Sequence, residues 1–367
     1  MTSRGKYRKS LIILTFILLI VGIMALISAS SVLGAEDFND VFYYVKRQLL
    51  RGVLIGLILI FLVSRFNYHH WAKLSLILLV LNLLLVGLCF LGPFKYVVNG
   101  AHRWLKVGPL VFQPSEFLKI SYILFLATIL AKTNATKVKK VLAAPFIIFI
   151  LSLGAIGLLL SRQPSTGTFL ILAGSSVAMY LIAGLSWKQF FILLLGGGLF
   201  LAMLITSTGY RSERIQTFLS GESDPLGKGY QTQQSLIGIG SGGIFGVGFG
   251  NSVQKFNYLP ASHTDAIFSI IAEEFGFLGS LCLLIIYLFF ISSGLGIAQH
   301  SPDSYGKFLT TGLISSIGIQ AFINIAAMCK LIPLTGIPLP FISYCSSALI
   351  TNLFMVGIVI NISKSSS

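Results

Sequence analysis

The residues of this chain that could do acid–base chemistry are few enough to inspect one by one. Only 11 of the 367 residues are Asp or Glu. Asp265 is the most suggestive of them, because the polar segment 259–265 runs there into a long apolar stretch. Two interpretations are open. Thr264 or Asp265 could cap the following helix, or Asp265 could be a general base at a membrane surface, where partial desolvation would raise its pKa.

Two further acids follow Asp265 at helical spacing. On a helix, Asp265, Ser269 and Glu273 would recur every four residues and line one face. At a rise of about 1.5 Å per residue, Glu273 would lie about 12 Å deeper than Asp265. Glu273 and Glu274 at that depth are costly unless they are paired or face a cavity.

A second candidate group is the acid–base pair Glu116 and Lys119. Ser115 suits a helix N-cap and Pro114 the turn before it, so Glu116 would lie in the first helical turn, where the dipole favours an anion. Lys119 is three residues further on and shares that face. The pair is either an ion pair that anchors the helix at the interface or a polar cluster that contacts a charged substrate.

Cations near aromatic residues fit a site for a phosphorylated sugar. Trp104 could be an ordinary interfacial residue, but Arg103 and Lys106 beside it also fit a platform for a sugar-phosphate. In the polar stretch 207–265, charged residues lie among tyrosines. A solvated loop would look similar, but a site for a phosphorylated sugar would also need such cations and aromatic faces. These residues are Arg211, Arg214, Asp224, Lys228 and Lys255, with Tyr210, Tyr230 and Tyr258.

Glycine accounts for seven of the thirteen residues from 238 to 250. Gly238, Gly240 and Gly243 match the dinucleotide pattern GxGxxG, but no strand or βαβ unit accompanies them, and no GK[ST] follows. We therefore expect the segment to serve close backbone packing at the membrane surface.

The elements that must position these residues are membrane helices. Hydrophobic residues make up 55% of the chain and charged residues 10%, against about 25% in soluble domains. This composition excludes a soluble globular enzyme, a disordered chain and a collagen-like fibre. The net charge of +15 does not indicate a nucleic-acid binder, because the basic residues are scattered between apolar runs.

The apolar runs predict an all-α polytopic membrane protein that forms one domain over residues 1–367. A membrane-spanning helix needs about 20 apolar residues. Ten segments qualify: 11–33, 48–64, 74–92, 116–131, 141–160, 167–185, 190–207, 266–291, 307–328 and 344–363. The largest polar stretch, residues 207–265, lies between the seventh and eighth.

Basic residues predict the orientation. Four precede the first segment and none lies between Gly34 and Val45, which places the N-terminus in the cytoplasm. Ten spans return the C-terminus to the same side. On this topology only Asp303 among the acids lies inside, so the acid–base chemistry belongs to the outer side.

These residues together resemble the SEDS family of bacterial cell-wall proteins, FtsW, RodA and SpoVE. The matching motifs are Asn99-Gly100-Ala101, Arg103-Trp104, Gln113-Pro114-Ser115-Glu116, Asp224-Pro225-Leu226-Gly227, Gly229-Tyr230-Gln231, Gln234-Ser235, Gly250-Asn251-Ser252-Val253-Gln254-Lys255, His263-Thr264-Asp265, Glu273-Glu274 and the run from Pro333 to Tyr344. The segment from Gly250 to Lys255 resembles the division-type FtsW branch more than the elongation-type RodA branch.

The resemblance implies a peptidoglycan glycosyltransferase of cell division that polymerises lipid II, a disaccharide-pentapeptide on undecaprenyl diphosphate, at the outer face of the cytoplasmic membrane. The family's key acid falls on Asp265, the general base of an inverting transfer, and its key tryptophan on Trp104. The other implied substrate-binding residues are Arg103, Glu116, Lys119, Arg211, Arg214, Lys255, His263, Gln234 and Ser235.

The resemblance also implies partners. Besides lipid II, the growing glycan strand and membrane lipid, these are a class B penicillin-binding protein of the FtsI type and other division proteins at the septum, with no nucleic acid. No metal cage is visible in the sequence, so a Mg²⁺ or Mn²⁺ ion would rely on substrate phosphates. Two alternatives are a lipid II flippase and a non-catalytic division scaffold that activates a transpeptidase.

The chain departs from the family pattern at three places. Ser165 stands where the family has an acid, in Gln163-Pro164-Ser165-Thr166-Gly167. The segment 345–348 reads Cys-Ser-Ser-Ala where Gly-Gly-Ser-Ser is usual, and His102 replaces an arginine. The departures concern the outer cavity and leave Asp265 and Trp104 in place.

Overall fold

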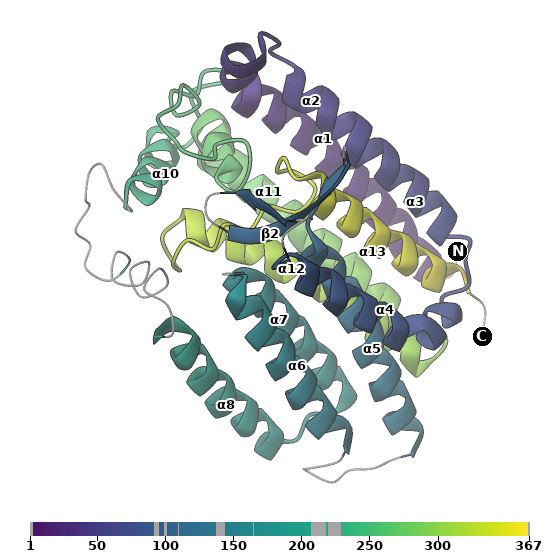
Figure 1. Cartoon of the computed structure of the whole chain (residues 1–367). Helices are drawn as coiled ribbons and strands as arrows, with labels where there is room; N and C mark the ends of the chain where they lie inside the picture. The colour runs from purple at the N-terminus through teal and green to yellow at the C-terminus, as the bar shows by residue number, and fades with distance from the viewer. Residues whose placement is uncertain are drawn as a thin grey trace.

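The computed structural model describes residues 3–91, 95–98, 101–108, 110–136, 144–163, 165–206, 218 and 229–365. Helices make up most of the regular structure (Figure 1). In chain order they are α1 (Ser3–Phe38), α2 (Tyr43–Gln48), the π-helix η1 (Leu49–Leu54), α3 (Ile55–Val63), α4 (His69–Leu88), α5 (Pro114–Thr136), α6 (Ala144–Arg162), α7 (Thr166–Ala183), α8 (Trp187–Thr206), α10 (Tyr230–Ser241), α11 (Ile267–Gln299), α12 (Ser304–Met328) and α13 (Ser346–Lys364).

Each predicted apolar segment falls on one or more of these helices, although α1 begins eight residues before its segment and α11 ends eight residues after its own. Among the described residues, eight helices are long and apolar enough to cross a membrane: α1, α4, α5, α6, α7, α11, α12 and α13. The second predicted segment is the run α2–η1–α3, in which a π-helix interrupts the α-helix, and the seventh is α8. The polytopic helical architecture is confirmed, and the total of ten spans stays a prediction.

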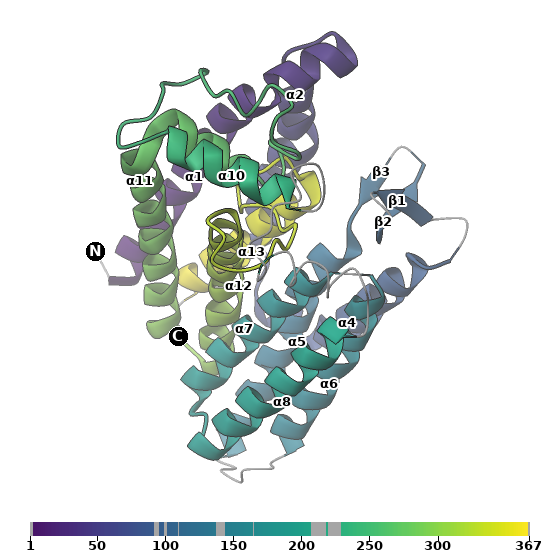
Figure 2. The ribbon, with the colours of Figure 1, turned by 90° about the vertical axis from the view of Figure 1, so that its left-hand side faces the viewer.

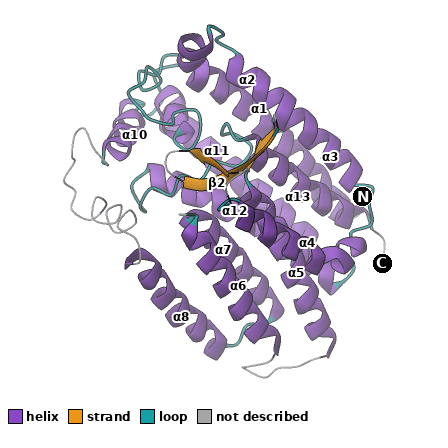
Figure 3. Ribbon diagram, in the orientation of Figure 1, coloured by secondary structure: helices purple, strands orange, loops and turns teal. Residues whose placement is uncertain are grey.

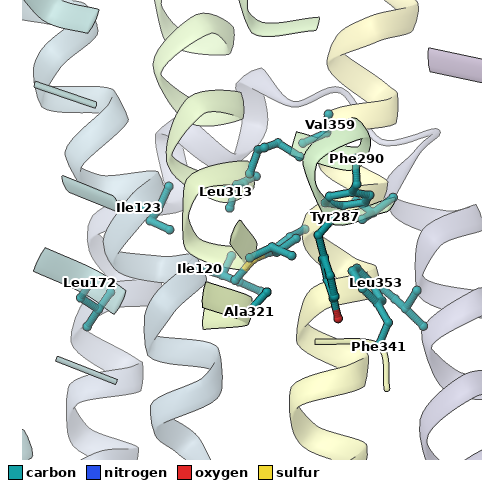
Figure 4. Close-up of a cluster of buried hydrophobic side chains, with 14 of the residues drawn as sticks. Ile120, Ile123, Leu172, Tyr287, Phe290, Leu313, Ala321, Phe341, Leu353 and Val359 are labelled. Carbon is teal, nitrogen blue, oxygen red and sulfur yellow. The ribbon is translucent and has the colours of Figure 1, made fainter. Parts of the chain in front are cut away.

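The bundle is built around α12 and α13. In each of these two helices, 83% of the most apolar window is buried, against 17% in α4 at the periphery. Figure 4 shows side chains of α5, α11, α12 and α13 meeting in the core, among them Ile120, Phe290, Leu313 and Leu353. The exposed side chains of α4 are largely apolar, as a face in contact with lipid tails must be.

Helix α8 stands at the edge of the bundle (Figure 1). A cavity of about 280 Å³ separates it from α6 and α7, and the side chains that line it are apolar. The rings of Phe169 and Phe200 cross part of this gap, with centroids 5.2 Å apart.

The chain between α4 and α5 carries a small sheet that the sequence did not predict. Strands β1 (Lys95–Val98), β2 (Ala101–Val107) and β3 (Leu110–Phe112) pair antiparallel in that order. Tyr96 on β1 lies opposite Trp104 on β2. Figure 2 shows the sheet projecting beside the ends of α4 and α5, so Trp104 and its neighbours lie on a strand and not on a free loop.

Helix α11 contains one non-helical residue, Gly276. The glycine-rich loop after α10, which is drawn in teal in Figure 3, makes main-chain hydrogen bonds to α11 on both sides of this break. Gly276 has φ 66° and ψ −163°, which interrupts the helical hydrogen bonds on both sides. The amides of Val247 and Gly248 donate to the carbonyls of Glu273 and Glu274, both at 3.0 Å.

Two more bonds cross in the other direction. The amides of Phe277 and Leu278 donate to the carbonyls of Gly243 and Ile244 at 2.9 and 3.1 Å. A Cβ atom on Gly246 would lie 2.1 Å from the Glu274 carbonyl oxygen, so only glycine permits this approach. The expectation that the glycine run serves close backbone packing is confirmed.

A Gly276→Ala substitution tests the break. The φ/ψ pair at this position is essentially restricted to glycine and costs other residues roughly 1–3 kcal/mol, and the new Cβ would lie 2.4 Å from the Gly246 nitrogen. We expect a lower unfolding temperature for the purified protein in detergent. Gly240→Ala is the matched control, because no atom lies within 4 Å of its Cβ position. Equal unfolding temperatures for the two variants would contradict this account.

Candidate active site

Asp265 lies in the turn that precedes α11. The helix begins at Ile267, and its N-cap residue Ala266 makes no side-chain cap bond. The amides of Thr264 and Ala266 donate to the carbonyl of Ala261 at 3.0 and 3.2 Å, which closes the turn. Neither Thr264 nor Asp265 is therefore the N-cap residue of α11.

The Asp265 carboxylate accepts hydrogen bonds from neutral side chains. Thr264 Oγ1 donates to Oδ1 at 3.0 Å, and Gln231 Nε2, on α10, donates to Oδ2 at 3.4 Å. A Cβ atom on Gly336 would lie 4.0 Å from Oδ2, so the chain passes close beneath the carboxylate there. Asp265 is partly exposed. Such a carboxylate, held in place but still accessible, can accept a proton from a bound hydroxyl group.

Glu116 and Lys119 form an ion pair inside the bundle. Helix α5 begins at Pro114, so Ser115 is not the N-cap as predicted; proline instead occupies the first helical position, where its missing N–H is tolerated. Lys119 Nζ lies 2.9 Å from Glu116 Oε2, and the two side chains are 0% and 4% exposed. The pair is thus buried and not an anchor at the surface.

Lys119 also contacts α12, where sequence reasoning missed the polar residues. Lys119 Nζ donates to Gln320 Oε1 at 2.6 Å, and Asn324, one turn further along α12, donates to the main chain of Asp265. Gln231, which donates to the Asp265 carboxylate, belongs to a family motif in the sequence but was not predicted as a site residue. The available signal was the four-residue spacing of two amides in an otherwise apolar span.

Lys255 lies in a second buried cluster. It is 6% exposed, and its ammonium group donates to the Gly250 carbonyl and to Ser28 Oγ, the latter at 3.4 Å. Its Nζ lies 3.9 Å from Glu274 Oε1, which also accepts from Ser28 Oγ. These contacts join α1, α11 and the glycine-rich loop, and they leave the Lys255 ammonium group inside the protein.

Glu273 fixes the chain on the other side of this cluster. Its carboxylate accepts from Ser252 Oγ and from the amides of Val253 and Gln254, at 3.0 and 3.4 Å. Both deep acids are therefore partnered, as their burial requires. The expected common face of Asp265 and Glu273 is not formed, because the helix starts after Asp265.

Arg103 and Trp104 lie on β2, and Arg103 reaches the connection between α6 and α7. Arg103 Nε donates to the Gln163 carbonyl at 3.1 Å. Both side chains are partly buried, so each keeps an open part. The sequence prediction of a cationic and aromatic platform fits this placement.

Two of the remaining predicted site residues lie on α10, and two lie outside the described part of the chain. Gln234 and Ser235 lie on α10; Gln234 is partly buried, and the buried Ser235 donates to Met328 Sδ at 3.7 Å. Arg211 and Arg214 lie outside the described residues.

Ser165, at the position where the family pattern has an acid, makes a hydrogen bond inside the protein. It immediately precedes α7, is 6% exposed, and its hydroxyl group lies 2.9 Å from Thr168 Oγ1. A neutral hydroxyl fits this buried position without the cost of burying a charge.

His263 packs in an aromatic cluster beside Asp265. Its ring centroid lies 4.7 Å from that of Tyr44 and 5.6 Å from that of Tyr344, and its Nδ1 is buried without a hydrogen-bond partner. Burial lowers the pKa of His263 from its ordinary 6.5 to about 4, against a weaker opposing effect of the Asp37 charge. The imidazole is therefore neutral at pH 7.

A family model described as "Cell cycle protein", that of FtsW, RodA and SpoVE, matches residues 8–367. The chain belongs to the FtsW/RodA/SpoVE family. Stage V sporulation protein E of Bacillus subtilis is 39% identical over 359 residues, 96% of each chain. A probable peptidoglycan glycosyltransferase FtsW of Trichlorobacter lovleyi is 36% identical and covers 98% of this chain and 93% of its own.

Solved structures agree with this family assignment. A chain of a peptidoglycan synthase complex, described as coordinating polymerization and crosslinking, superimposes with a TM-score of 0.77 at 26% identity, over 96% of both chains. The rod shape determining protein RodA of Thermus thermophilus gives 0.70 at 26% identity, over 96% of this chain and 95% of its own.

The described part of this family member offers no protein-made metal cage. No group of three or more His, Cys, Asp or Glu side chains that could hold an ion occurs among the residues that the structure describes.

The neutral His263 predicts how stability depends on pH. Because its pKa is about 4 in the fold and about 6.5 when unfolded, the unfolded chain takes up the proton first as the pH falls. Stability falls between pH 6.5 and 4, by roughly 3 kcal/mol, since one pKa unit corresponds to about 1.4 kcal/mol.

His263→Phe, which keeps the ring, should flatten this loss in unfolding-temperature curves measured from pH 7.5 to 4. His70→Phe, at an exposed histidine, is the control and should follow the wild-type curve. A His263→Phe curve parallel to the wild-type curve would show that the imidazole does not titrate in this way.

Proposed function

We propose that this protein is a peptidoglycan glycosyltransferase that polymerises lipid II at the outer face of the cytoplasmic membrane during cell division. The observation that carries the proposal is the placement of Asp265, a partly exposed carboxylate that Gln231 and Thr264 hold at one end of a membrane bundle. Relatives about 35% identical that are named as probable peptidoglycan glycosyltransferases support the reaction class.

The reaction that we assign to this site is an inverting glycosyl transfer. Asp265 accepts the proton of the acceptor 4-hydroxyl group as its oxygen attacks the anomeric carbon of the donor. The bond from that carbon to the diphosphate oxygen breaks, and undecaprenyl diphosphate leaves with the electron pair. Nearby cations stabilise the developing charge, so the leaving group needs no proton.

Among the predicted cations in the described residues, we assign Arg103 to the diphosphate, because its side chain is only partly buried. Trp104, which follows it on β2, offers a ring on which a sugar face can stack. Lys119 and Lys255 are buried beside Glu116 and Glu274. We assign these two lysines to support of the site, and Arg211 and Arg214 remain candidates for direct phosphate contact.

We further propose that the protein acts with a class B penicillin-binding transpeptidase at the division septum. A structural relative belongs to a peptidoglycan synthase complex, and that resemblance covers 96% of both chains. The transpeptidase would crosslink the glycan strand that this protein has just made.

Asp265→Asn tests the assigned base. The substitution keeps the size of the side chain and removes its basicity, and a general base contributes about 10²–10⁴-fold to a rate. We expect at least a 10²-fold loss of glycan-strand synthesis, measured with labelled lipid II and the purified protein together with its candidate transpeptidase, at an unchanged unfolding temperature.

Asp40→Asn is the matched control, because Asp40 is a partly exposed acid paired with the exposed Lys46. Polymer formation by Asp265→Asn at the wild-type rate would reject the base assignment. Transfer of labelled lipid II across vesicle membranes without any polymer would favour the flippase. Normal division with an inactive Asp265 variant would favour the scaffold.

A further inference from the structure

Two amide side chains on α12 lie in the interior of the bundle. Gln320 is 0% and Asn324 1% exposed, and they are one helical turn apart. A polar group buried in a membrane helix is unfavourable unless other groups satisfy it. Their partners therefore indicate what these side chains hold in place.

Asn324 binds the main chain at the candidate base. Its Nδ2 donates to the carbonyl of Asp265 and to the carbonyl of Ile337, both at 2.7 Å. One amide group thus ties the turn before α11 to the segment 333–344, which we call the strap. Because the bond is made to the backbone, it sets the position of Asp265 without occupying the carboxylate.

Gln320 binds the strap at the next residue and reaches the buried ion pair. Its Nε2 donates to the Pro338 carbonyl at 2.9 Å, and its Oε1 accepts from Lys119 Nζ at 2.6 Å. Lys119 is paired with Glu116 at 2.9 Å. Hydrogen bonds therefore connect this ion pair to the same strap that Asn324 holds.

The strap itself lies against Asp265. Gly336, with φ 65°, is the residue whose Cβ position is 4.0 Å from Asp265 Oδ2. At its far end, the amide of Tyr344 donates to the carbonyl of His263 at 2.9 Å. The strap is thus bonded to α12 on one side and to the turn that carries the base on the other.

We propose that Asn324 and Gln320 are positioning residues for Asp265. They set the distance between the Asp265 carboxylate and the strap, and they connect the strap to the Lys119–Glu116 pair. The proposal rests on the proposed function, in which Asp265 accepts a proton from the acceptor sugar. A general base must lie within hydrogen-bond distance of that proton, and a displacement of about 1 Å can reduce the rate about 10²-fold.

Asn324→Ala, compared with Asn352→Ala, tests this role. Asn352, on α13, is also 1% exposed, but neither of its amide atoms has a hydrogen-bond partner among the residues that the structure describes. We expect Asn324→Ala to lower kcat for lipid II polymerisation about 10²-fold with little change in KM. Asn352→Ala should retain the wild-type kcat. If Asn324→Ala does not fold, Asn324→Ser, which retains a donor, is measured in its place and should give an intermediate kcat.

Hydrogen–deuterium exchange tests the position of Asp265 without any reaction. Loss of the Asn324 amide should speed exchange in peptides that cover residues 259–268 and 333–344, whereas Asn352→Ala should leave both unchanged. Gln320→Leu should speed exchange in the strap and leave the turn at Asp265 less affected, since the Gln320 amide bonds to the strap and to Lys119.

The outcomes separate the two proposals. Absence of polymer from the wild-type protein with its transpeptidase would reject the proposed function, and the exchange measurement would still decide whether Asn324 holds the turn. An active wild type with unchanged kcat and exchange in Asn324→Ala would overturn the positioning role. Equal losses in Asn324→Ala and Asn352→Ala would also overturn it, because burial alone would then explain the effect.

Discussion

The whole structure depends on satisfying backbone hydrogen-bonding groups where water is absent. Continuous helices do this by themselves, and most of the chain is helical for that reason. The informative places are those where the helix stops. At Gly276 a loop supplies the missing backbone partners, and at the strap two side chains of α12 bind its carbonyls. Each irregular segment is built where another element can complete it.

The same requirement sorts the acidic residues by role. Glu116 and Glu274 each lie beside a buried lysine, and Glu273 accepts hydrogen bonds from two backbone amides. These carboxylates hold separate elements of the bundle together. Asp265 differs because it is partly exposed and has an amide and a hydroxyl group among its donors. That environment fits an acid that exchanges a proton with a ligand.

The membrane helices could be predicted from the sequence because their signal is local. A run of about 20 apolar residues can satisfy its backbone hydrogen bonds in lipid by forming a helix. The ten predicted segments all fall on helices. The strap, the sheet and the break in α11 could not be predicted, because each depends on residues far away in the sequence. Gly276, for example, is explained only by residues 243–248. Asp265 likewise suited a helix cap by its local context, and the structure shows that α11 starts two residues later.

The repair of α11 has a practical consequence. All four bonds across the break join main-chain atoms, so the identity of the outward side chains contributes nothing to them. Ile244 and Phe245 are 62% and 80% exposed. A reporter group, such as a fluorophore on a cysteine placed at residue 245, would therefore leave the four main-chain hydrogen bonds at the break intact. Its signal would report changes at the break and in the part of α11 between Ile267 and Gly276, which follows the Asp265 turn.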